Sequence, residues 1–308
     1  MDDFKQIVKE ICEELDIKMS IASKDWMIIL EKDDQKRFLL GTKFDLNTYA
    51  LGNIFDDKYA TYEMLKHIDV PVIEHQILFA PDNRNEFALS DNTYECAYRY
   101  FEKHNHNIVI KVNNGAQGKG VYHVTLKDDI KKILDELFVT NYSLSICPYY
   151  NIKSEYRVIM LDKKPELIYK KIKPVVIGDG NKTIKELLYQ LNSHFFDNKE
   201  DDEMGRKILK KGEKYEYNWQ FNLSNGASMT MDIDETTKNK VLSIANDVVS
   251  KIDLKFASVD VIELEDGSFL ILEINSGVAT KHFREIHPNG YEITKKIYKK
   301  AIIKMFNL

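Results

Sequence analysis

Residues 256–275 read FASVDVIELEDGSFLILEIN, and this stretch decides the fold class. Asp266 and Gly267 are a favoured two-residue turn between two runs of mostly apolar residues. The stretch therefore predicts an antiparallel hairpin in a largely buried sheet. If the turn has two residues, Glu265 pairs with Ser268, and every other cross-strand pair follows from that register.

In this register Asp260 lies directly opposite Glu273, and Asn275 follows two residues along on the same face. Carboxylates at the polar end of a buried sheet repel each other unless a cation lies between them. Magnesium typically binds one or two carboxylates together with nucleotide phosphate oxygens. The pattern predicts a metal site at these three residues. The alternative is an exposed hairpin with acidic decoration, and a three-residue turn would break the pairing.

Upstream, residues 107–126 read NIVIKVNNGAQGKGVYHVTL, which predicts a strand, a glycine-rich loop and a second strand. Glycine has no Cβ, so the loop from Gly115 to Gly120 can bring backbone amides close to a phosphate. Its spacing is not that of a P-loop, and it does not open a helix. A phosphate-binding loop and a plain flexible turn both fit the pattern.

Several lysines are candidates to bind the same anion. Lys111 stands in an apolar strand just before the loop, although an edge lysine is a common alternative. Lys170, Lys171 and Lys173 follow Arg157 along the chain, although a run of lysines is more often a solvated surface. Only the positions of these residues in the fold separate the two interpretations.

Helical patterns separate these strands. The spacing of apolar residues predicts helices after Asp57, after Asp128 as a capping residue, and over residues 234–252. Thr183 and Glu186 have the spacing of a helix capping box. Residues 1–56 mix a helical start with two strand-like runs, which indicates a small α/β lobe.

Composition narrows the class of protein. The chain has 308 residues, is 44% hydrophobic and 30% charged, and carries a net charge of −5, so we expect a folded protein that does not bind nucleic acid. Cys12, Cys96 and Cys147 have neither disulfide nor zinc spacing. No stretch reaches transmembrane length, and the N-terminus does not resemble an export signal. We therefore expect a cytoplasmic protein that does not enter a membrane.

Together these segments resemble the ATP-grasp superfamily, most closely the ligase domains of cyanophycin synthetase and bifunctional glutathione synthetase, over about residues 56–282. The resemblance rests on DKYATYEMLKHIDVPV, KVNNGAQGKGV, EYRVIML, VIGDGNKTIKELL, NLSNGA, FASVDVIEL and LILEINSG, in that order. It implies an α+β fold in which two lobes clasp ATP. We expect an N-terminal lobe over 1–56, a central lobe over 57–146 and a C-terminal lobe over 147–308.

The resemblance also implies roles for single residues. The cofactor-binding residues would be Lys58, Lys111, Gly115, Gln117, Gly118, Lys119, Gly120, Cys147 and Tyr149, the catalytic residues Arg157, Lys171 and Arg206, and the metal ligands Asp260, Glu273 and Asn275. Lysines and the closing loop would contact the phosphates of ATP, and Mg²⁺ or Mn²⁺ would bind at the metal ligands. The segment from Cys147 to Tyr149 would hold adenine.

The implied activity is that of an ADP-forming ligase, which joins a small-molecule or peptide carboxylate to an amine through an acyl phosphate. The resemblance also suggests a homodimer. Two alternatives are an enzyme that modifies a ribosomal peptide or protein, and a regulatory module that binds nucleotide without turnover. The chain departs from the larger relatives around Lys173-Pro174 and Gln220 and in its short N-terminal lobe, so their substrates do not transfer.

Overall fold

The structure is a computed structural model that describes residues 3–81, 93–115, 118–191, 203–216, 221, 223 and 227–308. These residues form four β-sheets, and every pair of neighbouring strands in them is antiparallel. Gln117, a predicted cofactor-binding residue, lies outside the described residues. No helix in the described ranges is both long and apolar enough to span a bilayer.

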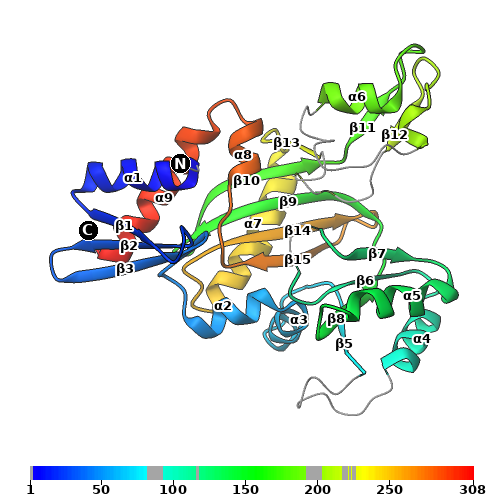
Figure 1. The fold of residues 1–308 in the computed structure, drawn as a ribbon, viewed down its shortest axis with the longest axis horizontal. Coiled ribbons are helices and arrows are strands. Elements are labelled where there is room, and N and C mark those ends of the chain that lie inside the picture. Colours follow the sequence, from blue (N-terminus) through cyan, green and yellow to red (C-terminus); the bar gives the residue numbers. More distant parts are fainter. Residues whose placement is uncertain are drawn as a thin grey trace.

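A five-stranded sheet lies at the centre of the molecule (Figure 1). Its strands, in spatial order, are β13 (Ser228–Thr230), β10 (Lys164–Ile172), β9 (Ile152–Leu161), β14 (Phe256–Leu264) and β15 (Phe269–Asn275). Helix α7 (Glu235–Lys251) packs on one face, against the alternate residues Tyr156 and Val158 of β9 and Val259 of β14. The residues between these, among them Glu155, Arg157 and Asp260, point to the opposite face.

A four-stranded sheet forms the neighbouring lobe. Its strands, in spatial order, are β5 (Gln76–Phe79), β8 (Ser143–Pro148), β6 (Ile108–Val112) and β7 (Val121–Val124). Helices α4 (Thr93–Lys103) and α5 (Lys127–Phe138) bury one face, into which Ile108 and Ile110 point. By alternation, Val109 and Lys111 point from β6 to the other face.

The N-terminal residues form a third sheet. Helix α1 (Asp3–Leu15) is followed by β1 (Lys18–Ala22), β2 (Met27–Lys32), β3 (Gln35–Leu40) and β4 (Lys43–Phe44). Its core includes Ile7 and Leu30, and it continues into Ile302 of α9 (Gly290–Phe306) and Phe256 of the central sheet. Short helix α8 (Lys281–Ile286) precedes α9. This lobe therefore depends on both ends of the described chain.

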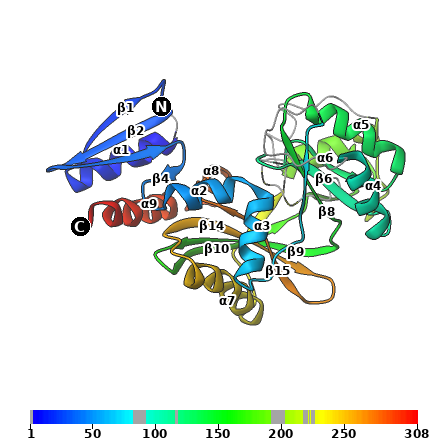
Figure 2. The ribbon, with the colours of Figure 1, turned by 90° about the horizontal axis from the view of Figure 1, so that it is seen from below.

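The central sheet lies between the other two lobes, which occupy opposite ends of the molecule (Figure 2). Helices α2 (Tyr49–Asp56) and α3 (Lys58–His67) connect the N-terminal sheet to the rest and pack against β15. The domain boundaries at residues 56 and 146 stay a prediction, but the core packing joins α3 to the central sheet through Leu65.

Within the described residues, the chain crosses between the central sheet and the four-stranded sheet twice. After α3 the chain runs beside β15, where Ile73 N–H donates to Ile271 O (3.1 Å), before it enters β5. It returns through residues 149–151, between β8 and β9. The two crossings meet, since Glu74 N–H donates to the hydroxyl of Tyr150 (3.0 Å). Two adjacent segments of the chain therefore connect the lobes.

A small two-stranded sheet extends from the end of β10. It contains β11 (Val175–Ile177) and β12 (Lys214–Glu216), and it carries α6 (Ile184–Leu191) and the 3-10 turn η1 (Met204–Arg206). The predicted capping box is confirmed, because Glu186 N–H donates to Thr183 Oγ1 and Thr183 N–H donates to Glu186 Oε2. The predicted cap at Asp128 is wrong. Helix α5 follows Leu126 without a side-chain cap, and Asp128 lies in its first turn.

The predicted two-residue hairpin turn is also wrong. Leu264 N–H donates to Ser268 O (2.9 Å), and Gly267 N–H donates to Leu264 O (3.0 Å), so the loop has three residues, 265–267. Gly267 has a φ of 81°, a conformation that glycine adopts without a steric penalty. A three-residue loop with its last residue left-handed is the next most common hairpin connection after the two-residue turn.

The predicted pairing of Asp260 with Glu273 is nevertheless confirmed. Next to the loop, Val261 pairs with Ile271, one residue out of the predicted register. The extra residue Leu272 then forms a β-bulge, which restores the register at Asp260. Two deviations of one residue, a longer loop and a bulge, therefore cancel.

Candidate active site

A row of charged side chains crosses one face of the central sheet. In the strand register Lys171 pairs with Glu155, Arg157 pairs with Asp260, and Asp260 pairs with Glu273. Farther along the same strands this face is apolar and lies under the N-terminal lobe. The charged row is therefore the polar end of a buried surface.

Four members of the row form a buried ion cluster. Arg157 binds Asp260 with a two-pronged contact, from Nε to Oδ1 (2.7 Å) and from Nη2 to Oδ2 (2.6 Å). Lys171 Nζ lies 3.3 Å from Asp260 Oδ2 and forms an ion pair with Glu155. The side chain of Asp260 is 2% exposed and that of Lys171 is 6% exposed, so solvent screens these charges only weakly.

The cluster sets the ionisation of its carboxyl groups. Burial alone would raise the pKa of Asp260, but the guanidinium of Arg157 and the ammonium of Lys171 lower it to about 2. Burial raises the pKa of Glu155 above its usual range, and Lys171 opposes that rise. Asp260 is thus the fixed negative charge of the cluster, and Glu155 is the carboxyl group that takes up a proton more readily.

Two lysines face this row from the side of the four-stranded sheet. Lys58 begins α3, and its Nζ donates to the carbonyl oxygens of Gly115 (2.5 Å) and Asn113 (3.3 Å). Burial lowers the pKa of Lys58, while the charge of Glu273 opposes this change. Lys111 is buried on β6 and is paired in register with Ser145. Both lysines were predicted from the sequence.

The glycine-rich loop follows Lys111 and packs closely on its own strand. A Cβ on Gly115 would lie 2.9 Å from Cβ of Val112, and one on Gly120 would lie 2.9 Å from Val112 Cγ2. Gly118 and Gly120 both have positive φ angles, of 69° and 63°. The structure therefore requires glycine at these positions for backbone reasons, whatever the loop binds.

The connection between the lobes supplies the apolar end of the site. The Tyr149 ring stacks on His123 (centroids 4.0 Å apart), and its N–H donates to Asn107 O (3.0 Å). Cys147 is fully buried, and burial raises the pKa of its thiol. His75, 4% exposed, has Nδ1 within 2.5 Å of Ser145 Oγ, and burial lowers its pKa well below the usual range.

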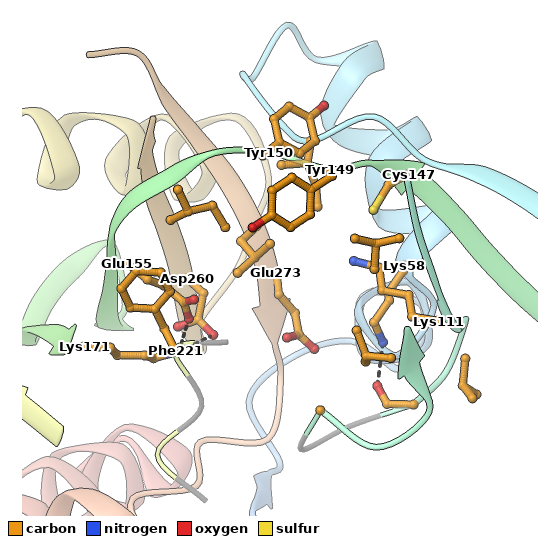
Figure 3. Close-up of a pocket in the computed structure, with 18 of the residues that line it drawn as sticks. Lys58, Lys111, Cys147, Tyr149, Tyr150, Glu155, Lys171, Phe221, Asp260 and Glu273 are labelled. Atoms are coloured by element: carbon orange, nitrogen blue, oxygen red, sulfur yellow. Dashed lines mark hydrogen bonds and ion pairs between the residues drawn. The ribbon is translucent and has the colours of Figure 1, made fainter. Parts of the chain in front are cut away.

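The ion cluster, the two lysines and the segment from Cys147 to Tyr149 line one cavity between the two sheets, of about 1130 Å³ with its open mouth included. Figure 3 shows Lys58 and Lys111 on one side, the cluster of Glu155, Lys171 and Asp260 on the other, and Glu273 between them. The apolar lining comes from residues of both sheets and of the connection, namely Ile73, Val109, Val121, Pro148, Ile152 and Leu272. A cavity with one apolar and one charged end suits a ligand that is itself apolar at one end and charged at the other.

Most of the predicted site residues meet in this cavity. The lining includes Lys58, Lys111, Gly115, Gly118, Lys119, Cys147, Tyr149, Arg157, Lys171, Asp260 and Glu273. Gly120, Asn275 and Arg206 are not part of the lining. Asn275 ends β15 opposite Ser258, and Arg206 is an exposed residue of η1 on the small sheet. The roles of all these residues stay predictions.

Comparison with known proteins identifies the fold. The chain superimposes on D-alanyl-alanine synthetase A from Vibrio cholerae with a TM-score of 0.56 at 13% identity, covering 97% of this chain and 92% of that one. It superimposes on a bifunctional glutathione synthetase from Pasteurella multocida with a TM-score of 0.54 at 16% identity, covering 97% and 43%. The fold is that of the ATP-grasp ligases.

The sequence is also similar, at low identity, to a curated protein of glutathione biosynthesis. The chain is 25% identical over 198 residues to the glutathione biosynthesis bifunctional protein GshAB of Streptococcus mutans. The match covers 57% of this chain and 26% of that protein, so the chain spans about a quarter of the length of this curated relative. No family model matches the chain.

The cavity also contains residues that the sequence did not single out. Glu155 is the ion-pair partner of Lys171, and Tyr150 and Phe221 line the wall. Glu155 could have been found, because it lies two residues from Arg157 in a mostly apolar strand and must share its face. No sequence pattern indicated that Phe221 would lie in the cavity. It reaches the cavity from a distant segment, and the Nζ of Lys173 lies 5.0 Å from the centroid of its ring.

Two carboxylates of this cavity are candidate ligands for a divalent cation. The described residues hold no group of three or more His, Cys, Asp or Glu side chains that could bind a metal ion, and both oxygens of Asp260 also accept hydrogen bonds from Arg157. Asp260 and Glu273 are direct cross-strand partners, and both line the cavity with carboxylate oxygens, which magnesium prefers. The side chain of Glu273 makes no hydrogen bond or ion pair with any residue in the described part of the chain. The bulge at Leu272 brings adjacent residues 272 and 273 into one lining, which regular alternation along a strand would not do.

Proposed function

We propose that this protein is an ATP-dependent ligase that joins a carboxylate to an amine through an acyl phosphate and releases ADP and phosphate. The observation that carries the proposal is the cavity between two sheets, with apolar walls at one end and cations beside paired carboxylates at the other. An adenine ring suits the apolar end, and a polyphosphate suits the charged end. The ATP-grasp fold supports this assignment.

The two ends of the cavity suggest separate roles in binding the phosphates and the adenine of ATP. Lys58, Lys111 and the loop from Gly115 to Gly120 would bind and orient the phosphates. The wall from Cys147 to Tyr149 would bind adenine, since a buried neutral thiol and a stacked ring offer an apolar surface. Holding the γ-phosphate in one position supplies much of the catalysis, because phosphoryl transfer requires alignment.

The carboxylate pair would hold the metal. Asp260 and Glu273 would bind Mg²⁺ or Mn²⁺, and Asn275 stays a predicted third ligand that the cavity lining does not support. When bound, such an ion neutralises charge on the phosphate oxygens. The charge of Asp260 is available for this at any pH near neutrality, because Arg157 and Lys171 keep its pKa low.

Arg157 and Lys171 would stabilise the negative charge that develops on the acyl phosphate. No protein nucleophile is required. The substrate carboxylate attacks the γ-phosphorus and ADP leaves, and the amine then attacks the acyl carbon and phosphate leaves. Both substrates would be small molecules or peptides. Arg206 keeps its predicted role at the substrate only if the small sheet moves towards the cavity.

The test of this function is phosphate release from ATP and magnesium across a panel of amino acids, dipeptides and polyamines, with ADP and AMP measured separately. Substrate-dependent ADP and phosphate in equal amounts are the expected result. AMP formation would contradict the acyl-phosphate mechanism. Tight ATP binding without turnover on any substrate would favour either a peptide substrate outside the panel or the regulatory alternative.

We expect Glu273→Gln to keep the fold and to lower turnover by at least about 100-fold, since it removes one negative charge from the metal site. The fold should survive because this carboxylate makes no hydrogen bond or ion pair with the described residues, and glutamine has nearly the same shape. Glu265→Gln on the exposed hairpin loop is the matched control and should leave turnover unchanged. Near wild-type turnover in Glu273→Gln would refute the metal site.

A further inference from the structure

Asn113 makes a set of contacts that none of the site assignments uses. It follows β6, two residues before Gly115, and it is 1% exposed. Its Nδ2 donates to Asp57 Oδ2 (2.6 Å), and its Oδ1 accepts the N–H of Tyr59 (3.1 Å). The other oxygen of Asp57 accepts the N–H of Ala60 (2.8 Å). Two side chains from different elements therefore cap the N-terminus of α3 together.

This contact joins the two lobes of the cavity. Helix α3 belongs to the central sheet, because Leu65 is fully buried in the core that β9, β14 and β15 form with α7. Asn113 directly follows β6 of the four-stranded sheet, and its Nδ2 also donates to Oγ of Ser143 (3.4 Å), the first residue of β8. The chain itself crosses between these sheets only before β5 and after β8, in the part that the structure describes. The contact between Asp57 and Asn113 is a third, non-covalent link.

The same link holds the cationic wall of the cavity. Lys58 lies directly after Asp57, and its N–H and Nζ both donate to the carbonyl oxygen of Asn113 (3.2 and 3.3 Å). Nζ also donates to the carbonyl oxygen of Gly115 (2.5 Å), the first residue of the glycine-rich loop. Any movement of Asn113 relative to α3 therefore changes the position of the ammonium of Lys58 and of the loop at once.

We propose that Asp57 and Asn113 form a latch between the lobes, which positions Lys58 and the glycine-rich loop for the phosphates of a nucleotide. The latch rests on the proposed function for the identity of the ligand, but its geometry is independent of it. Asn113 is a positioning residue and does not line the cavity itself. Its role is to hold Lys58 at one place where the two lobes meet, away from the segments that connect them.

The hydrogen bonds of the latch can also form when the aspartate and the asparagine are swapped between positions 57 and 113. In the single variant Asn113→Asp, two carboxylates meet where a 2.6 Å hydrogen bond stood, and they repel each other. In the double variant Asp57→Asn with Asn113→Asp, the amide donates in the opposite direction. An asparagine at 57 still caps α3 by accepting from Ala60, and an aspartate at 113 still accepts from Tyr59. Every hydrogen bond can form again.

The experiment measures the dissociation constant for ATP with magnesium, and separately the urea midpoint without nucleotide, in wild type, both single variants and the double variant. We expect Asn113→Asp to weaken ATP binding at least tenfold and the double variant to restore it to within about threefold of wild type. Asn114→Ala, an exposed neighbour, is the control and should bind ATP as the wild type does.

The two readouts separate the possible failures. If the double variant restores neither the urea midpoint nor ATP affinity, the latch does not exist. If the midpoint falls and recovers while ATP affinity stays constant across all four proteins, the contact is structural and its positioning role is overturned. If wild type does not bind ATP, the proposed function fails, and recovery of the midpoint in the double variant still demonstrates the link between the lobes.

Discussion

Glu155 and Lys171 are a buried ion pair whose members depend on each other. Removing the ammonium with Lys171→Met leaves Glu155 in a site that already raises its pKa, and we expect a loss of about 3–5 kcal/mol in the free energy of unfolding. Urea unfolding at neutral pH measures the loss. The double variant Lys171→Met with Glu155→Gln also removes the unpaired charge of Glu155. It should recover at least half of the lost free energy of unfolding. A double variant as unstable as the single one would show that Lys171 acts through Asp260 instead.

For single residues, the sequence predicted contacts between residues that are close together along the chain. Asp260 and Glu273 are joined by one hairpin, so their pairing could be derived from residue types and a turn. The link between Asp57 and Asn113 spans 56 positions and no local pattern signals it. The sequence identified Lys58 through the family resemblance, but not the carbonyl oxygens that its ammonium binds. Those contacts depend on how two sheets meet.

The hairpin of β14 and β15 depends on one left-handed residue. Gly267 has a φ of 81°, and no heavy atom lies within 4 Å of the place that a Cβ would take, so a substitution there meets conformational strain without a clash. We expect Gly267→Ala to lower the free energy of unfolding by about 1–2 kcal/mol. Gly267→Asn should cost clearly less, because asparagine tolerates this conformation. Equal losses for the two variants, measured by thermal or urea unfolding, would rule out backbone strain as the cause.

Elements were predicted more reliably than their ends. The hairpin, the two strands around the glycine-rich loop and helix α7 were all expected, because periodicity over many residues reports which faces are buried. The loop type was not readable, since Asp-Gly fits both a two-residue turn and a three-residue loop with left-handed glycine. Here Asp266 selects the longer loop in part by accepting two hydrogen bonds from Ser268, at 2.9 and 2.6 Å.

The stability of the whole molecule should fall as the pH drops below about 6.5. His75 is buried near Lys58 and Lys111, and burial keeps its pKa well below that of an unfolded histidine. Between these two pKa values the unfolded chain binds a proton that the folded chain does not, so folding loses up to about 1.4 kcal/mol per pH unit. Urea unfolding from pH 7.5 to 5.5 should show a steeper decline in wild type than in His75→Gln. Parallel declines in the two proteins would refute this contribution.

The arrangement of whole lobes was the least accessible to sequence reasoning. The family resemblance implied the ATP-grasp fold, and the structural comparisons agree with that fold. Nothing in residues 1–56 indicated that α9, about 290 positions away, completes their core. The rings of Phe4 and Tyr298 pack edge to face, with their centroids 5.5 Å apart. No sequence pattern near either residue predicts this contact.

The shared core of α1 and α9 has a consequence for biosynthesis. A ribosome adds about 5–20 residues per second, so α9 follows α1 out of the exit tunnel after an interval on the order of tens of seconds. During that time the inner face of the N-terminal sheet, with Leu30 and Leu39, has not met its final cover. The N-terminal sheet is thus completed only after α9 has been made, and its apolar inner face stays open to nascent-chain chaperones until then.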